Sequence, residues 1–444
     1  MRTDRFILEQ AGLASGLLTE ELIDHAWQAL VESHDNSLEE ITDRQLSDQL
    51  VELGYVNRWQ AEQLRQGRTK FTLGPYNILD AIGQGGMGYV FKGEHILLGR
   101  VEAIKVLPKQ QTDETSIANF RREIRAQAQL DHPNLVRLTY ADTDGDTYFL
   151  VTEFVPGSDL RRLVRFHGPL SQSQAAVLIS QTAEALDYVH SRSLIHRDVK
   201  PGNLLVTPEG RTKLTDLGLA YFAADLTIPS PNKPKHIVGT ADFLAPEVIV
   251  TPGEVLPISD VYSLGCTLYY AVTGKVPFPG GDTADKLRRQ LDEQPIPPLR
   301  LNPELEPEFI AVINAMMQKR PQDRIATAAE ALKRLKPWVD SAETSVWQEI
   351  GAKAELPEDD SFRNAILAET LPAIGGPQET QGHDKDRTDR VAVTRQEVRG
   401  PLPRDKPPWE PEETNRPGLG TKALVALAVL AALAAILLVI FNVE

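Results

Sequence analysis

Residues 196–203 read His-Arg-Asp-Val-Lys-Pro-Gly-Asn, and residues 216–218 read Asp-Leu-Gly. Between the two strings lies one apolar stretch with its own turn. Together they supply a carboxylate that can act as a base, a cation, and two oxygen ligands for a hard metal ion. In that order these groups are Asp198, Lys200, Asn203 and Asp216. Because transfer of a phosphoryl group from a nucleotide needs this set, the strings predict phosphoryl transfer. We interpret His196 as structural.

The composition limits the class of protein. The chain has 444 residues, 41% of them apolar and 25% charged, which is typical of a folded protein with about three domains. Its net charge of −15 argues against a nucleic-acid-binding protein, which requires clustered Lys and Arg. The single cysteine, Cys266, excludes a disulfide within the chain, and its apolar neighbours indicate a buried structural thiol.

A glycine-rich segment upstream is the candidate for contacts with the nucleotide phosphates. Its residues are Gly83, Gln84, Gly85, Gly86, Met87 and Gly88. The same glycine spacing occurs in dinucleotide-binding folds, where the loop opens a helix. Here residues 89–95 continue as a strand. We therefore predict the turn of a β-hairpin whose backbone amides approach phosphate oxygens closely.

Lys105 follows this hairpin by seventeen residues and stands in an apolar strand predicted at 101–107. At this position its ammonium group is expected to reach the α- and β-phosphate oxygens. Glu123, on a helix predicted over residues 114–130, is the candidate carboxylate that orients the ammonium group. Taken alone, each of the two residues is also compatible with a solvated surface position.

The segment 151–155 is predicted to connect a β-rich part to a helical part and to place its backbone against the edge of an adenine ring. The residues expected around the nucleoside are Val90, Ala103 and Leu205 on the ring faces, Glu153 and Val155 at the ring edge, and Asp159 at the ribose. For Asp159 the alternative is a purely structural N-cap of the following helix.

The periodicity of apolar residues divides the chain into parts. Residues 1–70 are predicted to form a small helical module, with a helix capped by Asn57; this module either binds a protein or packs on the next domain. Short strands bounded by glycines follow between Tyr76 and Pro108, two more flank Asp144-Gly145, and helical periodicity prevails beyond Asp159. The predicted fold class is α+β, with a small β-rich lobe before a larger helical lobe.

The C-terminal part differs in composition. Residues 341–421 contain nine prolines and charged clusters and are predicted to be a largely disordered linker, with room for a short helix near Phe362. Ala423–Phe441 is an uninterrupted apolar stretch of 19 residues, which predicts one transmembrane helix. Arg416 and Lys422 precede it, so we expect the N-terminal side to be cytoplasmic and the C-terminus to lie outside the inner membrane. The N-terminus lacks the apolar core of a signal peptide.

In this order the strings resemble those of the eukaryotic-type (Hanks-type) protein kinase family, over residues 76–337. Further landmarks of the resemblance are Ala245-Pro246-Glu247, Asp260 and Arg324, and it implies that Arg324 pairs with Glu247. Lys200 and Gly239-Thr240 resemble the serine/threonine branch. The glycine loop and the single membrane helix are similar to those of bacterial members.

The resemblance implies a two-lobed kinase fold that transfers the γ-phosphate of ATP to serine and threonine hydroxyls of protein substrates, with Mg²⁺, or Mn²⁺, as the metal. Asp198 is then the base, Lys200 neutralises the moving phosphoryl group, and Asn203 and Asp216 hold the metal. The chain departs from the family at Leu217, where phenylalanine is commoner, but leucine can fill the same apolar slot.

Arg197 implies control by phosphate on the segment between Asp216 and Glu247, where Thr227 and Ser230 are the candidate sites. Confinement to a membrane would favour self-association and phosphorylation between neighbouring copies. Two alternatives remain open: a membrane scaffold with the same fold and little catalysis, and a phosphotransferase that acts on a small molecule. Thr240 and the Ala-Pro-Glu string argue against the second alternative.

Overall fold

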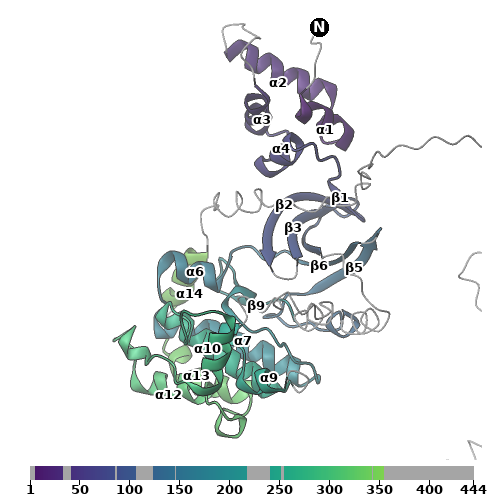
Figure 1. The fold of residues 1–444 in the computed structure, drawn as a ribbon. Coiled ribbons are helices and arrows are strands. Elements are labelled where there is room, and N and C mark those ends of the chain that lie inside the picture. The colour runs from purple at the N-terminus through teal and green to yellow at the C-terminus, as the bar shows by residue number, and fades with distance from the viewer. Residues whose placement is uncertain are drawn as a thin grey trace, which may run out of the picture. The chain divides into compact units, whose positions relative to one another are not determined.

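The computed structural model describes residues 6–33, 42–85, 88–106, 124–145, 147–217, 241–251, 255–342 and 344–354. Within these ranges a helical module, a β-sheet lobe and a helical lobe follow one another along the chain (Figure 1). This order agrees with the predicted α+β class.

Four helices form the N-terminal module. They are α1 (Ile7–Ser15), α2 (Glu20–Ser33), α3 (Asp43–Glu52) and α4 (Arg58–Arg65). The predicted cap of α4 is confirmed, since the Asn57 side chain accepts a hydrogen bond from Gln60 N at 2.8 Å. Inside the module, the buried Glu9 carboxylate accepts from Trp27 Nε1 and from Phe6 N, both at 2.8 Å. This carboxylate ties α1 to α2.

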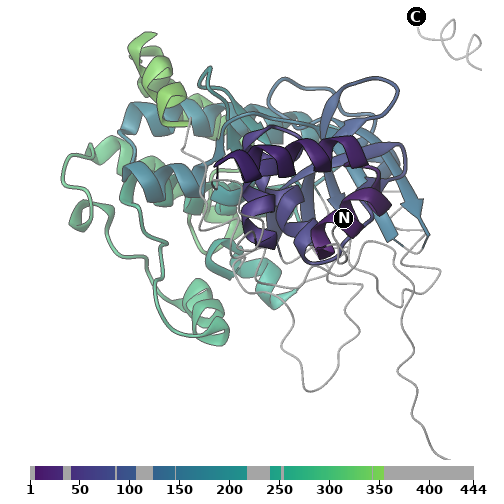
Figure 2. The same cartoon turned by 90° about the horizontal axis from the view of Figure 1, so that it is seen from above.

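The module shares one apolar core with the following sheet. Trp59 of α4 is 5% exposed and meets the rings of Phe71 and Phe91 at centroid distances of 5.9 and 6.0 Å. The Asn57 and Gln60 amides donate to the carbonyl oxygens of Leu79 and Ile78 on the adjacent strand. Two roles were left open for the module, and these contacts support the one in which it packs on the next domain. The view from above shows the purple helices of the module over the strands (Figure 2).

Six antiparallel strands make the sheet of the first lobe. They are β1 (Thr72–Leu73), β2 (Tyr76–Gly85), β3 (Gly88–His95), β4 (Val101–Val106), β5 (Leu138–Asp144) and β6 (Thr147–Glu153), in the order β1-β2-β3-β4-β6-β5. Gly85 pairs with Gly88, so the glycine-rich segment is a hairpin turn as predicted. Val90 pairs with Lys105, which places the predicted phosphate and adenine residues on adjacent strands.

The second lobe is mainly helical. Its helices are α6 (Leu160–His167), α7 (Gln172–His190), α9 (Pro246–Val250), α10 (Pro257–Thr273), α11 (Thr283–Asp292), α12 (Pro307–Met316) and α13 (Ala328–Asp340). The core of the lobe lies around α7 and α10 and contains Cys266, which is fully buried as predicted. Burial raises the pKa of this thiol to about 12, so it stays protonated. The segments of the candidate site adjoin a small three-stranded sheet: residues 196–203 precede β8, and Asp216 follows β9. The strands are β7 (Ser158–Asp159), β8 (Leu204–Val206) and β9 (Thr212–Leu214).

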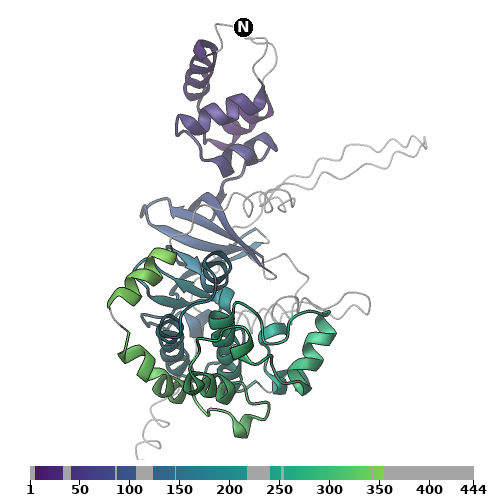
Figure 3. The same ribbon diagram turned by 90° about the vertical axis from the view of Figure 1, so that its left-hand side faces the viewer.

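An additional helix, α14 (Thr344–Ala354), lies within the segment predicted to be a linker. Ile350 and Ala354 are buried, and α14 contacts α6, α7 and β8 (Figure 3, yellow-green). Two glycines permit this close approach: a Cβ on Gly351 would lie 1.8 Å from Pro208 O, and a Cβ on Gly210 would lie 2.7 Å from Trp347 O. The folded part of the chain therefore continues beyond residue 337.

Several predictions fall on residues outside the described ranges. None of the helices in the described ranges is long and apolar enough to cross a bilayer, and the predicted span 423–441 lies outside those ranges. The same is true of Gly86, Met87, Glu123, Thr227, Ser230, Thr240 and the helix predicted near Phe362.

Candidate active site

The string 196–203 forms a loop that a single buried carboxylate fixes in place. Asp260 of α10 is 1% exposed and accepts backbone hydrogen bonds from His196 N at 2.8 Å and Arg197 N at 2.9 Å. His190 Nε2, at the end of α7, lies 2.8 Å from the same carboxylate. Arg197 has a φ of 69°, which a non-glycine residue rarely adopts, so these bonds stabilise a strained turn.

His196 is fully buried beneath this loop. Its Nε2 lies 2.9 Å from Thr215 O, and Asp198 N lies 3.3 Å from its Nδ1. Because a carbonyl oxygen can only accept, Nε2 carries the proton and Nδ1 accepts from Asp198 N. Burial lowers the pKa of His196, which keeps the ring neutral. His196 thus connects the two strings through hydrogen bonds, which agrees with the structural role predicted for it.

Three residues of the first string meet at one carboxylate. Asp198 is 2% exposed, and its Oδ2 lies 2.6 Å from Lys200 Nζ and 2.9 Å from Asn203 Nδ2. Asn203 Nδ2 also donates to Asp198 O at 2.8 Å, within the short 3-10 helix η1 (Pro201–Asn203). These charge-assisted contacts hold the carboxylate in one orientation. Asn203 therefore has a positioning role that the sequence did not indicate.

Lys105 and Asp216 form the second part of the site. Lys105 Nζ donates to Asp216 Oδ1 at 2.8 Å and joins strand β4 to the loop after β9. Burial alone would raise the pKa of Asp216, but the charges of Lys105 and Lys200 outweigh it, so that this pKa lies below its ordinary value. Asp216 is consequently ionised at neutral pH. The predicted partner of Lys105, Glu123, lies outside the described residues.

The donor set fits a hard divalent cation. Asp216 offers an ionised carboxylate, and Asn203 retains its side-chain oxygen because its Nδ2 already donates to Asp198. Mg²⁺ prefers oxygen ligands and is commonly held by one or two protein groups together with phosphate oxygens of the substrate.

The backbone at Asp216 and Leu217 has an unusual conformation and a tertiary contact. Asp216 has a φ of 66°, and the Gln127 side chain donates a hydrogen bond to the carbonyl oxygen of the next residue, Leu217. Leu217 packs against the core of the helical lobe, in the apolar slot expected for it.

The predicted nucleoside residues lie on the strands that border this site. Val90 and Ala103 are half-buried on β3 and β4, and a Cβ on Gly83 would meet Val90 at 3.6 Å. Leu205, half-buried on β8, pairs with Asp159. Ala103 pairs with Thr152 of the connecting segment, so Ala103 and Leu205 border this segment from the two lobes.

Glu153, predicted at the ring edge, already has partners for its amide and its carboxylate. Its backbone amide donates to Arg137 O at 3.0 Å, and its carboxylate accepts from Arg137 N and from Lys213 Nζ. Because the Glu153 amide has this partner, we assign the predicted adenine contact of this residue to its carbonyl. Val155, half-buried beyond the end of β6, remains available to supply an amide.

Asp159 is the N-cap of α6, since its Oδ1 accepts from Arg162 N at 2.9 Å. Burial raises the pKa of its carboxyl group, against the opposing effect of this hydrogen bond and the nearby arginines. The structural alternative for Asp159 is therefore present in the molecule, and contact with a ribose would be an additional role.

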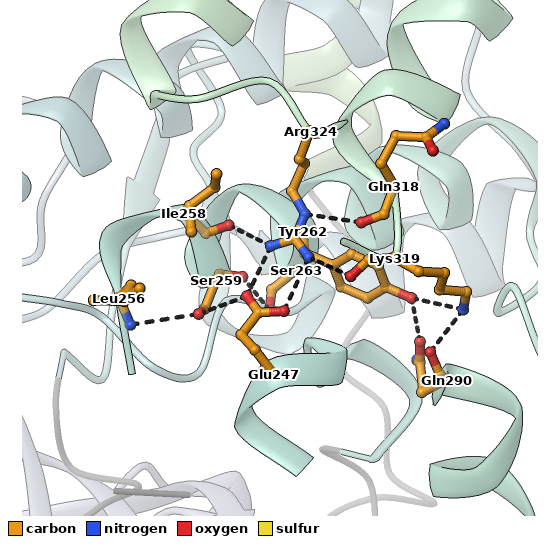
Figure 4. A network of polar contacts seen from close by, with 10 residues as sticks. All are labelled: Glu247, Leu256, Ile258, Ser259, Tyr262, Ser263, Gln290, Gln318, Lys319 and Arg324. Carbon is orange, nitrogen blue, oxygen red and sulfur yellow. Dashed lines mark hydrogen bonds and ion pairs between the residues drawn. The ribbon is translucent and has the colours of Figure 1, made fainter. Parts of the chain in front are cut away.

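The expected ion pair between Glu247 and Arg324 is confirmed (Figure 4). Arg324 donates to both carboxylate oxygens, at 2.8 and 2.9 Å, and Ser259 Oγ adds a third hydrogen bond at 2.8 Å. Burial would raise the pKa of Glu247, but the Arg324 contacts outweigh it and lower this pKa. This pair fixes the start of α9 against α10 and the loop before α13.

Sequence reasoning missed two features of the site. It named Asp260 without a role, although its position in a helix of apolar residues signals a buried carboxylate that needs partners. It also did not pair Lys105 with Asp216, which are 111 residues apart.

Comparison with known proteins agrees with the geometry. A family model described as "Protein kinase domain" matches residues 76–339. Serine/threonine-protein kinase PknB of Mycolicibacterium smegmatis is 36% identical over 261 residues, which is 57% of this chain and 41% of that protein. Serine/threonine-protein kinase PrkC of Bacillus subtilis is 33% identical over 269 residues, with 60% and 41% covered. The chain spans about two fifths of the length of these curated relatives.

Proposed function

The chain belongs to the protein kinase family, and from this membership we propose that it transfers the γ-phosphate of ATP to serine and threonine hydroxyls of proteins. One observation carries the proposal. The buried Asp198 carboxylate is held by Lys200 and Asn203, while the neighbouring Asp216 is held by Lys105. A base, a cation and an oxygen ligand set are thereby fixed within one small site. Relatives named as serine/threonine-protein kinases support the choice of acceptor.

Each residue has a distinct task in this proposal. Asp198 accepts or orients the proton of the attacking hydroxyl, and its low exposure keeps competing water away. Lys200, 2.6 Å from that carboxylate, stabilises the negative charge of the phosphoryl group as it moves. Asn203 and Asp216 would hold Mg²⁺, which supplies charge neutralisation between phosphate oxygens. Lys105 would exchange its contact with Asp216 for α- and β-phosphate oxygens.

The test is transfer of labelled phosphate from ATP to the protein itself and to a generic basic protein. Asp198→Asn should reduce the rate by at least about 100-fold, because it removes the base, and Lys105→Met should do so by loss of phosphate orientation. His25→Gln, on an exposed position of α2, is the matched control and should retain full activity. Equal labelling by wild type, Asp198→Asn and Lys105→Met would contradict the proposal and favour the scaffold alternative.

We further propose that the protein is anchored in the inner membrane by residues 423–441, with the described domains on the cytoplasmic side. The support is the length of this apolar stretch, 19 residues, and the position of Arg416 and Lys422 before it. Protease added outside intact cells should leave the kinase domain undigested. Its digestion, or recovery of the chain in the soluble fraction, would contradict the anchoring or its orientation.

Phosphorylation between neighbouring copies is the regulation that we propose, on Thr227 or Ser230. It is supported by Arg197, whose position beside the base suits an anionic partner. Wild type mixed with a tagged Asp198→Asn copy should label the inactive copy, at a rate that rises with total concentration. Labelling that is confined to the active copy would contradict this mechanism.

A further inference from the structure

Arginine side chains of helix α6 lie beside the catalytic loop and have no role in the function proposed above. The guanidinium carbon of Arg161 is 3.9 Å from the point where a Cβ on Gly202 would stand. Gly202 lies in η1 between Lys200 and Asn203, both of which contact the Asp198 carboxylate. The positive charge of Arg161 therefore stands next to the loop that must receive the acceptor hydroxyl.

This charge has little compensation from other groups. The Arg161 side chain is 65% exposed, and its Nε lies 3.9 Å from Asp159 Oδ1, near the limit of an ion pair. The same carboxylate oxygen already accepts the capping hydrogen bond from Arg162 N. Among the described residues, no carboxylate lies closer to the Arg161 guanidinium.

Arg165 extends the positive surface by one helical turn. Helix α6 reads Leu-Arg-Arg-Leu-Val-Arg-Phe-His and contains no acidic residue. Arg161 and Arg165 are four residues apart and exposed, so they lie on one side of the helix. The hydroxyl of Tyr270 on α10 donates to Arg161 O. We call Arg161 and Arg165 the α6 basic patch.

Three carboxylates in the described part of the same lobe are already paired with basic side chains. Asp242, in the 3-10 helix η2 (Ala241–Phe243), pairs with Lys286 at 2.8 Å. Glu247 pairs with Arg324, and Asp198 pairs with Lys200. These three carboxylates thus have basic partners, whereas the arginines of the α6 basic patch are exposed.

From this arrangement we propose that the α6 basic patch selects protein substrates with an acidic side chain close to the acceptor serine or threonine. The inference rests on the proposed kinase function and names its substrate class. An extended peptide advances about 3.3 Å per residue, so an arginine beside Gly202 reaches side chains within roughly two or three residues of the acceptor. A carboxylate there would gain a charge-assisted hydrogen bond that a lysine cannot form.

The experiment measures kcat/KM of the full-length, detergent-solubilised protein on peptides with one serine or threonine. Each flanking position, up to four residues on either side, carries aspartate, alanine or lysine in turn. Wild type should prefer aspartate to lysine by about ten-fold in at least one position, and the preference should weaken at high salt. Arg161→Glu should reverse this preference in favour of lysine, a gain that a misfolded variant could not produce.

Arg300→Glu is the matched control, because Arg300 is exposed on the separate 3-10 helix η3 (Pro298–Arg300). This variant should retain the preference of wild type, whereas Arg165→Glu should reduce it partially. Two results would overturn the inference: wild type phosphorylates the peptides without preference, or Arg161→Glu keeps the preference of wild type. Neither result would contradict the proposed kinase function. If wild type phosphorylated no peptide or protein, the proposed function itself would fail.

Discussion

Replacement of Arg324 by methionine tests how much the ion pair with Glu247 contributes to the stability of the helical lobe. The guanidinium side chain is fully buried and makes five hydrogen bonds (Figure 4). Two go to the Glu247 carboxylate, and three go to the carbonyl oxygens of Ile258, Gln318 and Lys319. Methionine fills part of the volume but leaves the carboxylate and three carbonyls without this donor.

The expected loss follows from these contacts. Removal of one partner of a buried ion pair costs about 3–5 kcal/mol, because the other charge stays buried without compensation. We expect about 4 kcal/mol here, since Ser259 still donates to Glu247. With a urea dependence of about 3 kcal/mol per molar, the unfolding midpoint should fall by about 1.3 M. The double variant Arg324→Met, Glu247→Met should lose less than Arg324→Met alone.

Urea unfolding followed by tryptophan fluorescence is the assay, because Trp338 and Trp347 lie in the affected lobe. The pH dependence adds a second readout. The pKa of Glu247 is lowered in the folded state, so its stabilisation is present above about pH 4.5 and is lost as the pH falls below the folded pKa. Arg324→Met should lack this loss. A cost of Arg324→Met below about 1 kcal/mol, or a double variant as unstable as the sum of the single variants, would refute the reasoning.

Three further predictions concern other parts of the molecule. Gly351→Ala should loosen the docking of α14, because the new Cβ would lie 1.8 Å from Pro208 O, even though alanine favours a helix over glycine by about 1 kcal/mol. Amide hydrogen exchange over residues 344–354 should accelerate in this variant. Ala352→Ser, at an exposed position of α14, should leave the exchange unchanged. Trp59→Ala should lower the free energy of unfolding of the N-terminal module by about 3–5 kcal/mol, which thermal unfolding should show as a transition at lower temperature. A loss of less than about 1 kcal/mol would contradict the core shared by module and sheet. Burial lowers the pKa of His196 in the folded state, so below about pH 6.5 the unfolded state binds a proton that the folded state does not. The free energy of unfolding should therefore decrease as the pH falls below this value, by up to about 1.4 kcal/mol per pH unit. Urea unfolding at pH 7.5 and 5.5 should show this fall in wild type and a smaller one in His196→Asn.

Local signals in the sequence predicted those features that depend on neighbouring residues. The cap by Asn57, the hairpin at Gly85 and Gly88 and the turn at Asp144-Gly145 each follow from residues within a few positions of one another. The string 196–203 likewise brings Lys200 and Asn203 to Asp198 because they share one short loop. These contacts carry most of the candidate site.

Contacts between distant segments could not be predicted in the same way. Nothing in the spacing of Lys105 and Asp216 indicates that their side chains meet, since tertiary packing alone sets that distance. Helix α14 was missed for another reason: the prolines and charges of residues 341–421 dominate the composition and hide a short apolar pattern. That pattern, Val346, Trp347, Ile350 and Ala354, has helical spacing and could have revealed the helix.

The docking of α14 also determines how the domain would bear a mechanical load. A force applied to the chain beyond residue 354 acts first on α14, whose Gly351 lies against Pro208 and whose Trp347 lies against Gly210. Pro208 and Gly210 belong to the turn between β8 and β9, and these strands carry Leu205 and lead to Asp216. Tension in the C-terminal chain would therefore act on the helical core that Ile350 and Ala354 join, and through the β8–β9 turn it would also act on the strands that lead to the nucleotide site.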